Sequence, residues 1–209
     1  KTTRGRGGMV ENVYVNNVNM KDIPAEAILF DMYYMAKDPV VLSGEKREPP
    51  KVEFKTVDET TPQFRNFYFR NITCNGAAKG IFVRGIPEMH VKNIWIENVV
   101  LQADEGIDIQ EATNINLKNI TMVSKNTNPV AYVLNSDSIT IDGLIYKDSA
   151  DVLAIVQGDR TKNVNIFNTD VTKAKQKLNA GFGSTEATVN WMKQPVVEEK
   201  KKKTKAKKE

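Results

Sequence analysis

A nine-residue pattern recurs along the chain and constrains its fold more than any other feature. It reads apolar, any, Asn, apolar, any, apolar, any, Asn, apolar, and copies begin at Val10, Phe64, Val91 and Ala112. Weaker copies cover residues 138–143 and 163–168. The first asparagines of the last five copies, counting Ser138 as one, are spaced 21 to 27 residues apart. Repeats of this length are typical of solenoid proteins.

Each copy predicts a β-strand with one buried face, because residues at alternate positions of a strand point to the same side. One such strand per repeat predicts coils that stack strand upon strand. A leucine-rich repeat has a similar length, but Val and Ile rather than Leu fill the apolar positions here. The pattern therefore favours an all-β fold, a parallel β-helix.

Asparagines bracket each predicted strand five residues apart. Asn tolerates the left-handed backbone conformation, and equivalent side chains can stack between neighbouring coils. We predict two ladders at the two ends of these strands, Asn12, Asn66, Asn93 and Asn114 in the first and Asn17, Asn71, Asn98 and Asn119 in the second. Two of these asparagines also begin glycosylation sequons, but the ladder uses both side chains, so glycosylation is not expected.

A second strand with alternating apolar residues follows each copy, so each coil is expected to add strands to two different sheets. These strands cover residues 27–31, 80–84, 106–110, 130–134 and 152–156. The inward residues are predicted to be Ile81, Val83, Ile107, Ile109, Val133, Leu153 and Ile155. The outward row is then Leu29, Asp31, Phe82, Arg84, Asp108, Gln110, Tyr132 and Leu134. We predict that this outer face is exposed and continues a substrate groove.

The chain reads as one solenoid domain, residues 1–195, followed by a disordered lysine-rich tail, residues 196–209. The tail holds seven lysines and three glutamates, which leaves 23 basic and 23 acidic residues in a neutral body. Residues 37–62 contain four prolines and are predicted to form an inserted loop, which either shapes a binding site or is a solvated excursion. A turn at 171–176 and a capping strand at 189–191 are expected after the repeat decays.

The residues by themselves indicate little catalytic chemistry. His90 is the only histidine and follows a proline-containing turn, which favours a structural role. Cys74 is the only cysteine and is expected to be a small buried residue. No metal-ligand spacing, phosphate loop or nucleophile motif is present, so no cofactor or metal is expected. An acidic cluster contains Asp104, Glu105, Asp108 and Glu111. It could supply a catalytic carboxylate pair, but a solvated corner of a coil is the favoured interpretation.

An ordered series of short motifs resembles a known family. The motifs are Lys1-Thr-Thr-Arg-Gly-Arg-Gly-Gly8, Met20-Lys-Asp-Ile-Pro24, Asp31-Met-Tyr-Tyr34, Thr61-Pro-Gln-Phe-Arg-Asn66 and Asp170-Val-Thr-Lys-Ala-Lys175. In this order they resemble the C-terminal part of the polygalacturonases, glycoside hydrolase family 28, of the type found in Bacteroides-like bacteria. The resemblance covers the chain apart from its tail. It implies a right-handed, single-stranded parallel β-helix of the pectin-lyase type.

The resemblance also implies an activity, the hydrolysis of galacturonic-acid-containing pectin with inversion at the anomeric carbon. The family's catalytic aspartates and histidine precede its Arg-Ile-Lys motif, and Lys1 matches the lysine of that motif. We therefore expect no catalytic residue in this chain, which reads as an internal fragment and is expected to be inactive alone. Its missing N-terminal coils would come from the same protein, and the parent is expected to be periplasmic or secreted.

Two substrate-binding residues can be carried over from the family, Lys1 and Tyr34. A lysine ammonium suits the carboxylate of a galacturonate unit, and a tyrosine ring can pack on a sugar face. The expected partner is a pectic polysaccharide or an oligogalacturonide. Further candidates for groove contact are Arg4, Arg6 and Arg84, with Tyr33 as the fallback for Tyr34.

Two other functions compete with this hypothesis. A non-catalytic, adhesin-like β-helix that binds carbohydrate would share the fold and would lack catalytic aspartates even in its full-length form. Binding to nucleic acid or to an anionic membrane is suggested only by the lysine tail, and the neutral body argues against it. No apolar run approaches the roughly 20 residues that a membrane span needs.

Overall fold

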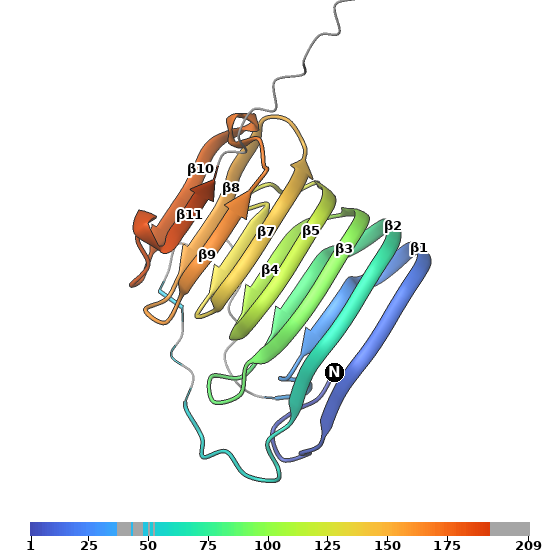
Figure 1. The fold of residues 1–209 in the computed structure, drawn as a ribbon, viewed down its shortest axis with the longest axis vertical. Coiled ribbons are helices and arrows are strands. Elements are labelled where there is room, and N and C mark those ends of the chain that lie inside the picture. The colour runs from blue at the N-terminus through green and yellow to red at the C-terminus, as the bar shows by residue number, and fades with distance from the viewer. Residues whose placement is uncertain (37–42, 44–47, 50, 52, 193–209) are drawn as a thin grey trace, which may run out of the picture.

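The computed structural model describes residues 1–36, 43, 48, 49, 51 and 53–192, and these form an all-β solenoid of about five turns (Figure 1). Equivalent strands of successive coils pair in parallel throughout. The prediction of a parallel β-helix is therefore confirmed. The predicted tail and the first part of the predicted loop insertion lie outside the described residues.

The first two strands, β1 (Met9–Asp31) and β2 (Gln63–Arg84), run unbroken around the corners of the solenoid. The later coils contain two separate strands each. One row consists of β3 (Val91–Ala103), β5 (Ala112–Ser124), β7 (Asp137–Tyr146), β9 (Lys162–Phe167) and β11 (Val189–Met192). The other consists of β4 (Glu105–Gln110), β6 (Ala131–Leu134), β8 (Ala150–Gln157) and β10 (Ala174–Gly181). The two rows do not pair with each other in the later coils, as predicted, but they are joined through β2, which pairs with β3 through residues 65–75 and with β4 through residues 79–84.

Both predicted asparagine ladders are present. In the first, the Nδ2 amide of Asn66 donates to Oδ1 of Asn12 at 3.2 Å, and the next two steps, to Asn93 and Asn114, are both 2.9 Å. The three steps of the second ladder measure 3.3, 3.4 and 3.1 Å. All eight asparagines have φ between 53° and 60°. Each one bends its strand around a corner and restarts the alternation, so that Val91, Ile94, Ile96 and Val99 are all buried.

Replacing Asn93 by alanine is expected to lower the free energy of unfolding by about 2 kcal/mol. Alanine removes two hydrogen bonds, one to Asn66 and one from Asn114, and it is strained at a φ of 58°. Glycine at this position loses the hydrogen bonds but keeps the backbone conformation without strain. Chemical denaturation should therefore show that the wild type is the most stable protein, Asn93→Gly is intermediate and Asn93→Ala is the least stable. Equal stability of the two variants would mean that the left-handed bend contributes nothing.

The core is built from rows of equivalent residues in successive coils. One row contains Val13, Phe67, Ile94, Ile115, Ile139, Val164 and Val189. Such a row forms because parallel pairing in register places the same inward position of every coil at the same corner of the interior. Cys74 belongs to this core and is 2% exposed, as the sequence predicted.

The C-terminal end of the solenoid differs in part from the prediction. The capping strand was expected at 189–191 and is present as β11. The expected turn is a short 3₁₀ helix, Val171–Lys173, but it leads directly into β10, a strand that the sequence pattern did not predict. β10 pairs with β8 although it carries only one buried apolar residue, Leu178. A second 3₁₀ helix, Glu186–Thr188, precedes β11.

The outward row of the second strands has the predicted register but not the predicted exposure. Asp31 pairs with Arg84, which pairs with Gln110, so the continuous face exists. Gln110 is buried, however, and so are the other outward residues of these later coils, Asp108, Tyr132 and Leu134. The prediction of an exposed outer face is therefore wrong for this part of the solenoid.

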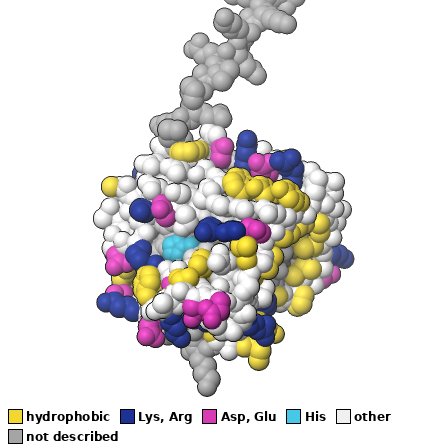
Figure 2. All heavy atoms as spheres, turned by 60° about the horizontal axis from the view of Figure 1, so that its bottom comes forward, with side chains coloured by type: hydrophobic (Ala, Val, Ile, Leu, Met, Phe, Trp, Pro, Cys, Tyr) yellow, Lys and Arg dark blue, Asp and Glu magenta, His cyan; other side chains and the backbone are white. Residues whose placement is uncertain are grey.

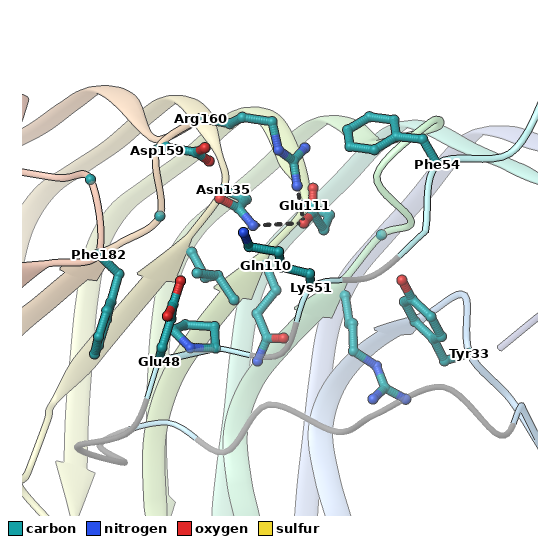
Figure 3. Close-up of a pocket in the computed structure, with 16 residues that line it drawn as sticks. Tyr33, Glu48, Lys51, Phe54, Gln110, Glu111, Asn135, Asp159, Arg160 and Phe182 are labelled. Carbon is teal, nitrogen blue, oxygen red and sulfur yellow. Dashed lines mark hydrogen bonds and ion pairs between the residues drawn. The ribbon is translucent and has the colours of Figure 1, made fainter.

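The outer face of the later coils is buried in part because apolar residues gather on it. Ile155 was predicted to face the core, but it pairs with Tyr132 and joins a second apolar cluster outside the sheet, with Tyr132, Leu134 and Val152. Residues 48, 49, 51 and 54 of the insertion lie on the same side (Figure 3). Alternation gave the direction of these side chains correctly apart from Ile155, but it carried no information about what covers them.

Candidate functional site

A groove of about 730 Å³ runs along the ends of the second row of strands, between these ends and the described part of the insertion (Figure 3). Tyr33 lies at one end of the groove and Phe182 at the other. Strand ends and the turns after them form its floor, with Arg84, Gly85, Gln110, Glu111, Leu134, Asn135, Gly158, Asp159, Arg160 and Gly183. The opposite wall comes from Glu48, Pro49, Lys51 and Phe54. The groove is thus lined by a mixture of charged, amide and aromatic side chains.

Lys1, Arg6 and Tyr34 form an exposed cluster beyond the Tyr33 end of the groove, here called the cation cluster. The Lys1 Nζ atom lies 5.7 Å from the centroid of the Tyr34 ring, and the Arg6 Cζ atom lies 5.8 Å from it. Tyr34 is 38% exposed. Neither Lys1 nor Arg6 forms an ion pair with any residue of the described part of the chain. Among the described residues, the cluster therefore presents two positive charges without an acidic partner beside an aromatic ring.

Backbone pairing fixes the cation cluster in place. The amide of Thr2 donates to the Asp31 carbonyl at 2.8 Å, and the amide of Tyr34 donates to the Thr2 carbonyl at 2.9 Å. The N-terminal segment is therefore anchored to the segment that follows β1, which carries Tyr34. This anchoring joins two sequence motifs that lie about 30 residues apart, and it brings Lys1 beside Tyr34.

Arg4 and Arg84, the other two candidates, are already neutralised. Arg4 forms two contacts of 2.6 and 2.8 Å with the Glu88 carboxylate, and Arg84 donates twice to Asp31 Oδ1 at 2.8 and 3.0 Å. Burial alone would raise the pKa of Glu88, but the hydrogen bond and charge of Arg4 outweigh it and lower that pKa. Both arginines also contact the buried ring of Tyr33, at 5.5 and 4.7 Å. Of the five candidate residues, only Arg84 lines the groove.

A buried ion pair lies beneath the groove, between Asp108 and Lys79. The Lys79 ammonium donates to Asp108 Oδ2 at 2.7 Å, and the Gln110 amide donates to Asp108 Oδ1 at 2.8 Å. Burial raises the pKa of Asp108, and the Lys79 charge offsets only part of this rise. Burial would lower the pKa of Lys79, but Asp108 outweighs it and raises that pKa. The sequence expectation of a solvated corner is wrong for Asp108.

Glu111 is the second buried carboxylate, and it too was expected to be solvated. Its Oε1 atom accepts from Asn135 at 3.0 Å and from Arg160 at 2.5 Å, and its Oε2 atom lies 3.3 Å from His90 Nε2 (Figure 3). His90 Nδ1 in turn lies 2.7 Å from the Thr113 hydroxyl. His90 therefore sits in a structural network, as the sequence suggested. The sequence singled out Glu111, but nothing in it signals Arg160, which lies 49 residues away.

In the polygalacturonases that the sequence resembles, one catalytic aspartate lies in an Asn-Thr-Asp motif. The expectation that this motif is missing from the chain is wrong, because residues 168–170 are Asn-Thr-Asp. The position of the motif argues against a catalytic role. Asp170 caps the first 3₁₀ helix and accepts hydrogen bonds from the Thr172 amide at 3.0 Å and the Thr172 hydroxyl at 2.7 Å. These hydrogen bonds lower the pKa of Asp170. It does not line the groove, so the match is structural.

Charge on the surface is mixed rather than of one sign. On the face drawn in Figure 2, basic and acidic side chains are interspersed, with the histidine among them. Such a surface attracts a charged ligand only where charges are locally unpaired. The cation cluster is a site of that kind.

In the part of the chain that the structure describes, no group of three or more His, Cys, Asp or Glu side chains could hold a metal ion. Among the same residues, no helix has the length and apolar character needed to cross a membrane. The chain matches no family model, no curated protein and no solved structure.

Proposed function

We propose that the chain binds galacturonic-acid-containing pectin as the C-terminal part of a polygalacturonase-type glycoside hydrolase. The observation that carries this proposal is the cation cluster, in which Lys1 and Arg6 lie beside the exposed ring of Tyr34 and form no ion pair with any described residue. An acidic sugar offers a carboxylate to the two cations and a C–H face to the ring. The resemblance to the polygalacturonases points to the same ligand through Lys1 and Tyr34.

The carboxylates support a binding role for this part of the protein. Inverting hydrolysis needs one carboxylic acid to protonate the leaving oxygen and one carboxylate to activate water, on opposite faces of one bond. The three buried carboxylates in or beneath the groove, Asp31, Asp108 and Glu111, are each held by a basic partner. We therefore assign substrate contact to this chain and place the acid and the base elsewhere in the parent protein.

The same pairing of buried carboxylates favours a second candidate function, a non-catalytic carbohydrate-binding β-helix. Both candidates bind an acidic polysaccharide, and they differ in whether the parent protein cleaves it. A reducing-sugar assay on polygalacturonate separates them when it is run on the parent protein beside this chain. We expect turnover by the parent and none by the chain. Turnover by the chain that is abolished by Asp104→Asn or Asp108→Asn would place catalysis in residues to which we assign none.

Changing both cations of the cluster to glutamine, Lys1→Gln with Arg6→Gln, is expected to weaken polygalacturonate binding at least about tenfold at low ionic strength. Each cation contributes on the order of 1 kcal/mol through an exposed charge contact. Titration calorimetry at two salt concentrations measures the effect, and the wild-type affinity should fall with added salt. Lys118→Gln is the matched control, since it removes an exposed lysine from β5. Equal losses in both variants would contradict a localised site.

A further inference from the structure

Phe182 has a backbone conformation that is unusual for an aromatic residue. It follows β10 directly, and its φ is 52°. The residues at the equivalent position of the three preceding coils are Glu111, Asn135 and Gly158, all with positive φ. Asn and Gly are the residues that usually occupy such a bend, because a bulky side chain there is crowded against its own backbone. A phenylalanine at this bend therefore costs free energy that Asn or Gly would not.

The ring is not part of the hydrophobic core. Phe182 is 38% exposed, and it lines the groove. Gly158 beneath it has no side chain, and a Cβ there would approach Asn135 Oδ1 to 2.1 Å. The Asn135–Glu111 hydrogen bond of 3.0 Å therefore has no counterpart in the next coil. An aromatic ring is held in a strained conformation at an open end of a binding groove, which is where strain most often serves a ligand.

We propose that Phe182 is a stacking platform for a sugar ring at the far end of the groove. A sugar presents C–H groups on one face and hydroxyls at its edge, and an aromatic ring packs against the former. Asp159, which lies next to Gly183 and also lines the groove, can accept hydrogen bonds from the hydroxyls. The inference deepens the proposed function, because it takes the ligand to be an acidic oligosaccharide bound at the cation cluster.

The distance between the two ends of the groove sets the ligand length. Five interstrand steps separate the coil of Tyr33 from that of Phe182, in the order β1, β2, β4, β6, β8, β10. At about 4.8 Å a step this is about 24 Å. An oligosaccharide must therefore span several units to contact both the cation cluster and Phe182, and short fragments reach only one end.

The test compares the binding of trigalacturonate and hexagalacturonate by titration calorimetry. The wild type should bind the hexamer more tightly than the trimer. In Phe182→Ala we expect hexamer affinity to fall on the order of tenfold and trimer affinity to stay unchanged. Phe182→Trp should restore the hexamer affinity. Lys1→Gln with Arg6→Gln should weaken both ligands. Phe182→Gly relieves the positive φ, so its hexamer affinity shows the loss of the ring without the backbone strain that Phe182→Ala retains.

The outcomes separate this inference from the proposed function. If Phe182→Ala and Phe182→Gly prefer the hexamer over the trimer as strongly as the wild type does, Phe182 is not a stacking platform. The proposed function would be unaffected by that result. If the Phe182 variants lose affinity for the trimer and the hexamer equally, the stacking platform is also contradicted, because Phe182 would then affect the whole site. If the wild type binds neither oligomer, the proposed function fails and the platform fails with it.

Discussion

Lys79→Met is expected to lower the free energy of unfolding by about 3 kcal/mol at neutral pH. Its partner Asp108 is 2% exposed, and the Lys79 ammonium 2.7 Å away is the charge that compensates it. Without that charge, the Asp108 carboxylate must either stay ionised without a basic partner or bind a proton, and both cost free energy. Guanidinium unfolding followed by circular dichroism measures the difference.

The loss is expected to shrink as the pH falls. Burial raises the pKa of Asp108 above its ordinary value of 3.8, so this group favours the folded state most when it is protonated, and that contribution is lost as the pH rises through the folded-state pKa. Lys79→Met removes the offsetting charge and raises this pKa further. The gap between variant and wild type should therefore be largest near pH 7 and smallest near pH 4. Lys79 itself stays protonated throughout this range, because its pKa is raised above 10.5.

An exposed ion pair provides the matched control. Lys125 lies 2.5 Å from Asp104, but the two side chains are 84% and 58% exposed. Lys125→Met should change the stability by less than about 0.5 kcal/mol, because water screens such pairs. If Lys125→Met and Lys79→Met lower the free energy of unfolding by the same amount, burial does not increase the contribution of the Lys79–Asp108 pair. The double variant Lys79→Met with Asp108→Leu should recover part of the loss, because it leaves no buried charge.

Gly106→Ala is expected to cost about 3 kcal/mol or more. A Cβ on Gly106 would lie 2.1 Å from the Val130 carbonyl oxygen and 3.0 Å from its carbon, both backbone atoms of the next coil. That carbonyl also accepts the Ile107 amide hydrogen bond at 2.9 Å. It cannot withdraw without opening the ladder between β4 and the following coil, so overpacking here shifts backbone rather than side chain.

Two other glycines calibrate this prediction. A Cβ on Gly80 would meet the Met122 sulfur at 2.6 Å, and this flexible side chain can move aside, so Gly80→Ala should cost less than Gly106→Ala. A Cβ on Gly181 would meet nothing within 4 Å, so Gly181→Ala should stay within about 0.5 kcal/mol of the wild type. Urea midpoints of the three variants give the order. A Gly106→Ala protein as stable as Gly181→Ala would show that the coils can separate freely.

The sequence named candidate residues for the site but not their arrangement. Lys1, Arg6 and Tyr34 form one cluster, whereas Arg4 and Arg84 are neutralised by Glu88 and Asp31. Those ion pairs join residues 84 and 53 positions apart, and no local pattern shows them. Phe182 could have been noticed only through its place between two glycines, because its strained conformation depends on a strand, β10, that the repeat did not indicate.

The solenoid, its corners and its core could be predicted from the amino-acid sequence. Alternation of apolar residues and the left-handed preference of Asn are local properties, and each acts within nine residues, so they were enough to predict both ladders. The exposure of the outward residues depends instead on contacts between distant segments. Gln110 and Asp108 lie on the outer face as predicted, yet both are buried, because exposure depends on what packs over that face. A second apolar cluster lies on that face, and long-range packing of that kind leaves no periodic trace in the sequence.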